Sequence, residues 1–262
     1  MKVAILYICT GKYNQFFQEF FSSCEKFFLP GIEKDYFVFT DNMNICDIHN
    51  VYLRYKQCEG FPKDSLFRFE MFLNIKKELK QYDYIFFFNS NSKFLQTILP
   101  EEVLPSSTGT GLVGALWPRR HRIFNIPPYY PYERNKKSTA YIPPLKGNYH
   151  YYMGGVNGGT SDAFLKMIEI CARNIKEDYN NGIIACVHDE SHINHYFHST
   201  NPDIVLKNEY CWPEEWPCES MPKMIFRDKI KIDPSFKKKP VSTLARLWRV
   251  ILRTKKAIGW YI

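Results

Sequence analysis

Three short apolar runs place the strongest limit on how this chain can fold. They occupy residues 3–10, 36–41 and 84–91, and each ends in small or polar side chains. Uninterrupted hydrophobicity is typical of strands that are covered on both faces, as in a parallel sheet. Between these runs, residues 16–28 and 65–80 show the apolar spacing of helices, which suits crossover connections. The sequence therefore predicts an α/β fold.

Polar side chains gather where these runs end. In open α/β sheets ligands bind beyond the carboxyl ends of the strands, and here those ends carry Thr10, Asp41 and the triplet Asn89-Ser90-Asn91. We therefore expect a nucleotide pocket at this edge. No G-x-G-x-x-G follows the first run and no G-x-x-x-x-G-K-[ST] occurs, which removes the main support for a dinucleotide oxidoreductase or a P-loop enzyme. The segment 11–13 is interpreted as a short turn.

A second feature combines acids, imidazoles and glycines. Residues 188–194 read His-Asp-Glu-Ser-His-Ile-Asn, and residues 154–159 contain four glycines, which let the backbone approach a ligand closely. A carboxylate such as Glu190 can stabilise or attack the positively charged anomeric carbon of a glycosyl transfer, and Asp189 can accept hydrogen bonds from sugar hydroxyls. The combination predicts a sugar-handling site, although each part alone would also fit solvated acids or a flexible turn.

Two metal questions follow from these motifs. His188 and His192 leave a zinc site open as an alternative, although the order H-E-x-x-H is not met. Asn89 and Asn91 stand where many nucleotide-sugar enzymes hold a divalent cation with Asp-x-Asp, and amide oxygens lack the charge that Mg²⁺ favours. A donor site here would dispense with metal and neutralise a diphosphate with cations, whereas the alternative is a polar strand end without a ligand. The candidate cations are Arg68, Arg119, Arg120, Arg122 and the run Lys237 to Lys239.

The net charge of +8 lies entirely in residues 234–262, which contain eight Lys and Arg and no acid, so the remainder is formally neutral. A nucleic-acid-binding enzyme would carry its basic footprint around its site, so we expect no nucleic-acid partner. The eight cysteines form no C-x-x-C pair, and no signal peptide or membrane span is evident, which predicts a cytoplasmic protein with reduced thiols.

The basic tail has the pattern of an amphipathic helix. We expect such a helix to lie on an anionic membrane, at the inner face of the cytoplasmic membrane, with Trp248, Trp260 and Tyr261 near headgroup depth. The alternative is a terminal helix docked on the domain with its charges in water. One side of the helix carries Arg246, Arg249, Arg253 and Lys256, and the other carries Leu244, Leu247, Trp248, Ile251 and Ile258.

The order of motifs resembles glycosyltransferase family 6, the retaining α-1,3-galactosyl and N-acetylgalactosaminyl transferases that include the histo-blood-group A and B enzymes and bacterial relatives. The resemblance runs from about Lys2 to Lys231. It rests on residues 36–41, Asn89-Ser90-Asn91, Tyr132-Glu133-Arg134, Ala140-Tyr141-Ile142-Pro143, Tyr151-Tyr152 with the glycines, and residues 188–194 followed by Tyr196.

This resemblance implies a GT-A fold, a Rossmann-like mixed sheet flanked by helices, with UDP-GalNAc or UDP-Gal as donor and a galactose-containing acceptor. The catalytic domain is expected over 1–235, nucleotide-binding over about 1–95 and acceptor-binding and catalytic over about 96–235, followed by the basic tail 236–262. Glu190 matches the catalytic carboxylate. The resemblance assigns Arg68, Met153, Gly154, Gly155, His188 and Asp189 to the donor sugar, Ile8, Cys9, Thr10, Tyr13, Asn89, Ser90, Asn91 and Lys237 to UDP, and Trp117, Val187, Tyr210, Trp212 and Glu214 to the acceptor.

Some positions depart from the family pattern. Asn89 and Asn91 replace two aspartates, which resembles the bacterial, metal-independent branch, so no cofactor is expected. A glycine at position 155 favours UDP-GalNAc, because it leaves room for the acetamido group. Trp117 replaces a histidine and Val187 an aromatic residue, which bears on whether the family's usual acceptor, a fucosyl-α-1,2-galactose unit, is used. The lost aspartates also leave open a carbohydrate-binding or membrane-scaffolding protein with a decayed transferase site.

Overall fold

A computed structural model describes residues 1–106, 108–118, 126–147, 149–218, 220–237 and 242–261. Five of the cations predicted to meet a diphosphate lie outside these residues, namely Arg119, Arg120, Arg122, Lys238 and Lys239. Of the predicted diphosphate-binding cations, the described residues therefore contain Arg68 and Lys237.

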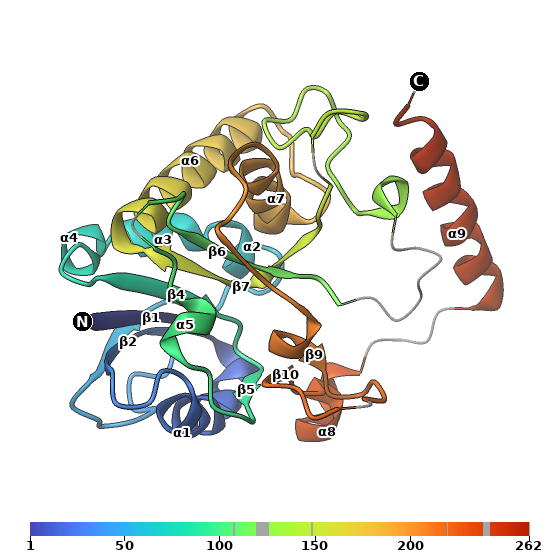
Figure 1. The fold of residues 1–262 in the computed structure, drawn as a ribbon. Coiled ribbons are helices and arrows are strands. Elements are labelled where there is room, and N and C mark those ends of the chain that lie inside the picture. Colours follow the sequence, from blue (N-terminus) through green and yellow to red (C-terminus); the bar gives the residue numbers. More distant parts are fainter. Residues whose placement is uncertain (107, 119–125, 148, 219, 238–241, 262) are drawn as a thin grey trace.

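Within the described residues a seven-stranded sheet forms the centre of the molecule, in the order β3-β2-β1-β4-β7-β6-β8 (Figure 1). The first four strands along the chain are parallel, as the apolar runs predict. β7 is antiparallel to both β4 and β6, so the sheet is mixed. The strands are β1 (Lys2–Cys9), β2 (Glu33–Thr40), β3 (Val51–Tyr55), β4 (Tyr84–Phe88), β6 (Leu112–Leu116), β7 (Tyr152–Thr160) and β8 (Ile204–Leu206).

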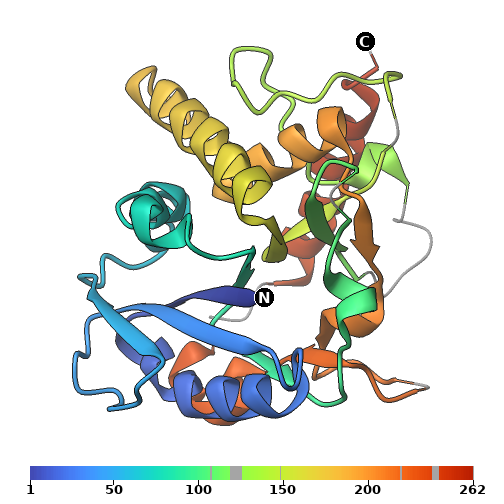
Figure 2. The ribbon, with the colours of Figure 1, turned by 60° about the vertical axis from the view of Figure 1, so that its left-hand side comes forward.

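Helices cover both faces of this sheet (Figures 1 and 2). On one face α1 (Phe17–Phe27) buries Phe20, whose ring stacks on Tyr7 of β1 with centroids 4.2 Å apart. On the other face lie α3 (Arg68–Leu73), α6 (Ser161–Asn180) and α7 (His188–Thr200), which share one apolar cluster with the sheet. Burial of both sheet faces explains why the strands read as uninterrupted apolar runs.

The single helix predicted over 65–80 is interrupted in the structure. It consists of α2 (Lys63–Leu66), α3 and α4 (Lys76–Leu79), and the backbone leaves helical dihedral angles at Phe67 and Ile75. Buried side chains occur on all three pieces, so packing on the sheet outweighs the local preference for one continuous helix.

A small second sheet lies beyond the carboxyl end of β4, where the chain continues into β5. Among the described residues it contains three strands in the order β5-β10-β9, namely β5 (Ser92–Phe94), β10 (Met224–Phe226) and β9 (Trp212–Pro213). The remaining short helices are η1 (Gly11–Phe16), α5 (Pro100–Val103), η3 (Pro127–Tyr129), η4 (Asn208–Tyr210), α8 (Lys229–Ile232) and η5 (Pro234–Phe236).

The C-terminal helix α9 (Thr243–Ile258) stands at the edge of the molecule and contacts η3 (Figure 1). It is anchored by Ala257 and Trp260, each 5% exposed, and the Trp260 indole N–H donates to the Ile142 carbonyl at 2.8 Å. The prediction that Trp260 lies at a membrane surface is therefore wrong, because its ring packs inside an aromatic cluster. None of the described helices has the length and apolarity needed to cross a membrane.

Candidate functional site

The carboxylate of Glu190 is held at the start of α7. Its Oε1 accepts a hydrogen bond from the Tyr151 hydroxyl at 2.5 Å, and its Oε2 accepts one from the Gly154 N–H at 2.6 Å. Burial raises the pKa of this carboxyl group to about 7, and the bonds from Tyr151 and Gly154 only partly oppose that rise. The carboxylate is therefore fixed in direction and sits in a weakly polar surrounding, as a group that acts on developing positive charge requires.

The helix itself is joined to the sheet by an amide side chain. Asn194, one turn after Glu190 on α7, accepts the Tyr152 N–H and donates to the carbonyl oxygens of Tyr152 and Glu190 at 2.7–2.9 Å. His188 begins the helix with φ of +52°, a conformation that few non-glycine residues adopt. This backbone turn and the Asn194 amide together set where the first turn of α7 points.

The glycine-rich segment is the central strand β7, and its glycines serve two purposes. At Gly154 an added Cβ would lie 3.2 Å from both Cβ and Oε2 of Glu190, so any larger residue would force the Glu190 side chain to shift by a few tenths of an ångström. Gly158 instead accommodates a ring, because a Cβ there would lie 2.3 Å from Phe86. Gly154 therefore lies against Glu190, whereas Gly158 and Gly159 pack within the sheet, and a ligand-facing role of the first two glycines stays a prediction.

Gly155 bears on the predicted choice of donor sugar. A Cβ at this position would lie 3.3 Å from Asn89 Cβ and 3.2 Å from the ring of Phe226. Asn89 and Phe226 therefore border the space beside Gly155, and the choice of UDP-GalNAc over UDP-Gal stays a prediction.

Asp189 and Arg68 form a buried ion pair beside Glu190. Arg68 Nη2 lies 2.8 Å from Asp189 Oδ2, and the guanidinium stacks on the ring of Phe87 at 4.2 Å. The N–H is not aligned with the carboxylate, so within the described residues both Nε and Nη2 lack a hydrogen-bond partner. Burial raises the pKa of Asp189 even though Arg68 opposes that rise. Arg68 thus offers unused N–H donors in a buried position, which suits an anionic ligand.

A cavity of about 530 Å³ opens at the carboxyl ends of β1 and β4. It is in the size range of small-molecule sites, roughly 300–1,000 Å³. The structure brings to it six residues predicted to bind the donor, namely Ile8, Thr10, Tyr13, Arg68, Asn89 and Ser90. Cys9 differs, because its side chain is fully buried in the core on the other face of the sheet.

Other residues of this cavity were missed by sequence reasoning. Lys12 belongs to η1 rather than to a simple turn, and Lys229 comes from α8, more than 200 residues later. Phe61 and Phe236 supply aromatic rings. The only sequence signal was the position of Lys12 directly after the first strand, since the others depend on the chain returning to this edge.

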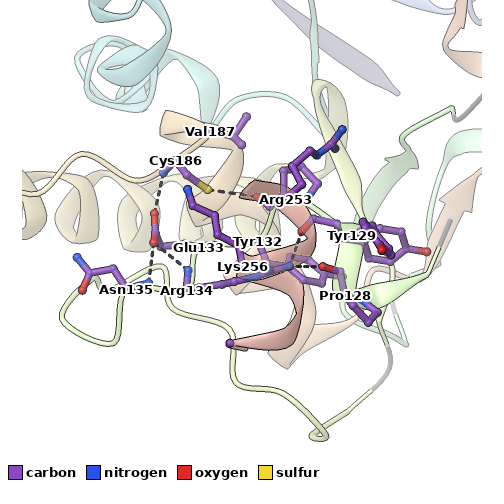
Figure 3. Close-up of a pocket in the computed structure, with 13 residues that line it drawn as sticks. Pro128, Tyr129, Tyr132, Glu133, Arg134, Asn135, Cys186, Val187, Arg253 and Lys256 are labelled. Atoms are coloured by element: carbon purple, nitrogen blue, oxygen red, sulfur yellow. Dashed lines mark hydrogen bonds between the residues drawn. The ribbon is translucent and has the colours of Figure 1, made fainter. Parts of the chain in front are cut away.

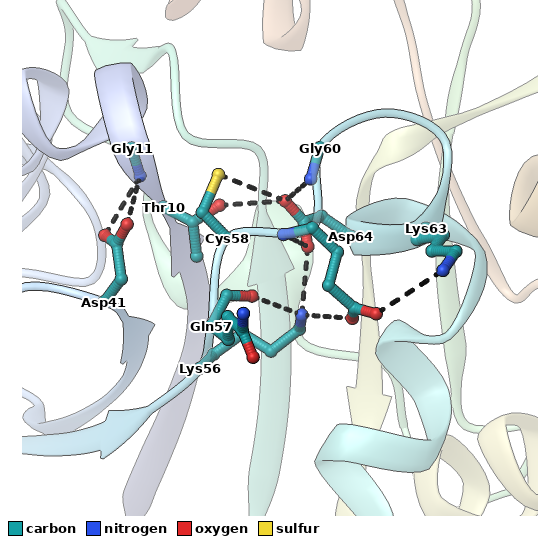
Figure 4. Close-up of polar contacts among 10 residues, drawn as sticks. Thr10, Gly11, Asp41, Lys56, Gln57, Cys58, Gly60, Lys63 and Asp64 are labelled. Atoms are coloured by element: carbon teal, nitrogen blue, oxygen red, sulfur yellow. Dashed lines mark hydrogen bonds and ion pairs between the residues drawn. The ribbon is translucent and has the colours of Figure 1, made fainter.

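Two aspartates tie the loops around the cavity together (Figure 4). Asp64 accepts hydrogen bonds from the Thr10 hydroxyl at 3.1 Å and from the Gly60 N–H at 3.0 Å, and its other oxygen meets Lys56. Asp41 accepts the Gly11 N–H at 3.0 Å. The predicted cluster of polar strand ends is therefore present, and Asp41 and Asp64 hold together the loops around the cavity, which Asp64 also lines.

The two asparagines at the end of β4 are engaged by the backbone. Asn89 Oδ1 accepts the Ser90 N–H at 3.0 Å, and Asn91 Nδ2 donates to the Arg227 carbonyl at 2.8 Å. An aspartate at position 91 could not make the second bond, because a carboxylate only accepts. Asn91 lines a second cavity of about 820 Å³ together with Lys229 and Lys237, and this cavity shares Tyr13, Phe61, Lys229 and Phe236 with the first.

The residues predicted to contact the acceptor divide into two groups. Trp117 lies beside Tyr151, with ring centroids 5.6 Å apart, and Val187 precedes α7, so both are near Glu190. Tyr210 is 9% exposed and its hydroxyl donates to Glu102, so it belongs to the core. Trp212 packs on Trp216 and Glu214 accepts the Arg227 side chain N–H and the Asp228 N–H.

The zinc alternative has no geometric support in the described residues. The ring of His188 contacts Phe61, whereas His192 is buried and its Nε2 lies 3.8 Å from Asp178. Burial lowers the pKa of His192 to about 4. In the part of the chain that the structure describes, no cluster of three His, Cys, Asp or Glu side chains could hold a metal ion.

Comparison with known proteins gives consistent results. The pattern of Glycosyltransferase family 6 matches residues 1–234. The chain is 37% identical to the O-antigen biosynthesis glycosyltransferase WbnI of Escherichia coli over 233 residues, which are 87% of this chain and 95% of the relative. It is 31% identical to the histo-blood group ABO system transferase 1 of Rattus norvegicus over 220 residues, and 30% to the globoside alpha-1,3-N-acetylgalactosaminyltransferase 1 of Gallus gallus over 229 residues. These alignments cover 79% and 83% of this chain but only 60% and 63% of the two animal proteins.

Proposed function

The chain belongs to glycosyltransferase family 6, and from this premise we propose that it transfers GalNAc or Gal from a UDP-sugar, with retention, to a galactose-containing glycan in α-1,3 linkage. Its mixed sheet flanked by helices is consistent with a GT-A-like glycosyltransferase fold. The name of the bacterial relative, which belongs to O-antigen biosynthesis, supports an acceptor in surface-polysaccharide synthesis.

One observation carries this proposal. The half-buried carboxylate of Glu190 is aimed by Tyr151 and Gly154 and lies beside Arg68, which lines the cavity at the strand ends. With a donor sugar between them, the carboxylate would stabilise or attack the positively charged anomeric carbon while UDP departs on the side of the cations. The distance between acid and sugar in the complex decides between covalent attack and ion-pair stabilisation.

We also propose that no divalent metal assists the leaving diphosphate. Asn89 and Asn91 present neutral amides in place of carboxylates: Asn89 Oδ1 accepts the Ser90 N–H and Asn91 Nδ2 donates to the Arg227 carbonyl, whereas Asn91 Oδ1 has no hydrogen-bond partner among the described residues. Arg68, Lys229 and Lys237 line the two adjoining cavities and would supply the compensating positive charge. A chelator should then leave the transfer rate unchanged, and a rate restored only by Mn²⁺ or Mg²⁺ would refute this part of the proposal.

The decisive assay offers the protein UDP-GalNAc and UDP-Gal with galactosides that do or do not carry α-1,2-fucose, and measures UDP release and product linkage. Retained α-configuration with dependence on acceptor supports the transferase. Glycan binding without any UDP release would instead support the alternative, a carbohydrate-binding or membrane-scaffolding protein with a decayed site.

A peripheral membrane contact of α9 is a further part of the proposal. The helix turns Leu244, Leu247, Trp248 and Ile251 outward, each at least 48% exposed, with the exposed Lys255 among them. Such a face suits the interface of an anionic bilayer at the inner side of the cytoplasmic membrane. Sedimentation with anionic and neutral vesicles tests it, since Leu247→Glu should abolish binding, and binding that survives this change would exclude the helix face.

A further inference from the structure

A third cavity, of about 520 Å³, lies between α9 and the body of the protein (Figure 3). Its walls come from η3 and the segment that follows it, from Cys186 and Val187 before α7, and from the last turns of α9. None of the residues predicted from sequence to bind the donor lines it. Its size, however, is again that of a small-molecule site, roughly 300–1,000 Å³.

Positive charge dominates this cavity. Arg134, Arg253 and Lys256 line it, and Glu133 is the one acid among its described lining residues. Glu133 is already satisfied by the backbone, because its carboxylate accepts the N–H groups of Arg134, Asn135 and Cys186 at 2.7–2.8 Å. Within the described residues neither Arg253 nor Lys256 forms an ion pair, and Arg134 Nε is buried without a partner. Cations gathered around an empty space without counter-ions favour an anionic ligand.

The orientation of α9 strengthens this argument. A surface helix normally turns its apolar face to the protein and its charges to water. Here Arg253 and Lys256 follow each other at helical spacing beside the buried Ala257 and Trp260, and they line the cavity while remaining exposed to solvent, and the apolar side chains of the helix are exposed as well. Figure 3 shows Arg253 and Lys256 on α9 beside the cavity, which Cys186 and Val187 also line. The helix is thus docked through Ala257 and Trp260 with its charges in water, as the alternative from the sequence expects, and two of these charges line the cavity.

The cavity is linked to the Glu190 carboxylate through Val187 and through a group of tyrosines. The Val187 carbonyl accepts the Glu190 N–H at 3.1 Å, and Val187 lines the cavity. Tyr151, which donates to Glu190, packs against Tyr130 and Tyr132 of the cavity wall with centroids 6.0 and 5.6 Å apart. A glycan that places a hydroxyl group at Glu190 could therefore extend its neighbouring residues into this space.

We propose that this cavity is an acceptor subsite for an anionic group, a phosphate or a sugar carboxylate, on the glycan next to the galactose that receives the sugar. The assignment rests on the proposed transferase function. Arg253 and Lys256 of α9 bind the anion, and Arg134 supplies a third positive charge from the opposite wall. The C-terminal helix, which lies beyond the family match at residue 234, is thereby a specificity element of this chain.

The kinetic test compares matched acceptors and neighbouring lysines. Initial rates are measured with a neutral galactoside, the same glycoside carrying a phosphate, and one carrying a uronic acid. Lys256→Glu and Arg253→Glu should raise KM for the preferred anionic acceptor at least tenfold and leave KM for the neutral acceptor and the UDP-sugar unchanged. Lys255→Glu is the matched control, since Lys255 is equally basic and exposed but does not line the cavity.

Comparison of the two anionic acceptors identifies the anion. In the unaltered protein only one of them, the phosphate or the uronic acid glycoside, should have a lower KM than the neutral galactoside. Equal KM values for all three acceptors, or an equal effect of Lys255→Glu and Lys256→Glu, would overturn the subsite. If the protein transfers sugar to neutral galactosides and an anionic group on the acceptor does not change KM, the subsite is refuted but the proposed transferase function is not.

A binding measurement keeps the inference testable without turnover. Calorimetric titration of inorganic phosphate into protein saturated with UDP should show a site that Arg253→Glu and Lys256→Glu remove and Lys255→Glu retains. Absence of transfer with every acceptor would overturn the proposed function, whereas absence of this phosphate site would overturn the subsite. Limited proteolysis of each variant shows whether α9 remains docked through Trp260.

Discussion

Replacement of Glu190 by glutamine should make the protein less active and more stable. The change removes the charge that acts on the sugar, so turnover should fall roughly 10²–10³-fold with little change in UDP affinity. Glutamine keeps the shape of the side chain, can still accept the Gly154 N–H, and can donate its amide to the Tyr151 hydroxyl. The packing around the first turn of α7 should therefore survive.

The gain in stability follows from the pKa of Glu190, which burial raises from 4.5 to about 7. Because the folded state holds this proton more tightly than the unfolded state, ionisation destabilises the fold progressively between pH 4.5 and pH 7. The cost reaches about 3 kcal/mol above pH 7 and vanishes below pH 4.5. Glutamine carries no such cost, so the variant should be more stable than the unaltered protein by about 3 kcal/mol at pH 8 and similar at pH 4.

Urea unfolding of both proteins at a series of pH values measures this difference directly. Glu102→Gln is a control of opposite sign: burial pushes the pKa of Glu102 upward, but the Leu99 N–H and Lys223 hold it below its usual value. That variant should lose stability at pH 8. In kinetics, kcat/KM of the unaltered protein should rise with pH around an apparent pKa near 7. Parallel stability curves for Glu190→Gln and the unaltered protein would refute the reasoning.

Other predictions test neighbouring contacts. Gly154→Ala places a Cβ 3.2 Å from Glu190 Oε2, so turnover should fall roughly tenfold or more in steady-state assays while UDP still binds, and normal turnover would contradict the close approach. Asn91→Asp removes a buried donor to a carbonyl, so the free energy of unfolding in urea should fall by about 1–3 kcal/mol without any gain from Mn²⁺. Trp260→Ala should undock α9 and expose it to limited proteolysis, and unchanged cleavage would show that another contact holds the helix.

Sequence reasoning found the elements whose signal is local. The apolar runs predicted β1, β2 and β4, and helical spacing predicted α1 and the tail helix α9. The glycine-rich segment was harder to interpret, because glycines have no side chains to alternate between the faces of a strand. Its assignment as β7 depends on Phe86 of β4, which packs where Gly158 leaves space.

The sequence by itself determined the chemistry of the site. It supplied a glutamate in an acidic and imidazole cluster, amides in place of carboxylates at a strand end, and the order of motifs that identifies the family. These features are encoded by residue type and short spacing, which local interactions preserve in any context.

Only the tertiary structure decided which distant residues meet. Lys12 and Lys229 converge on the donor cavity because the chain returns to the same sheet edge, and the pKa of Glu190 rises because surrounding elements exclude water. The tail helix docks through Ala257 and Trp260 and leaves Leu244, Leu247, Trp248 and Ile251 exposed, which its amphipathic pattern alone would not suggest. Such outcomes depend on the sum of long-range packing and desolvation, and no window of neighbouring residues contains that sum.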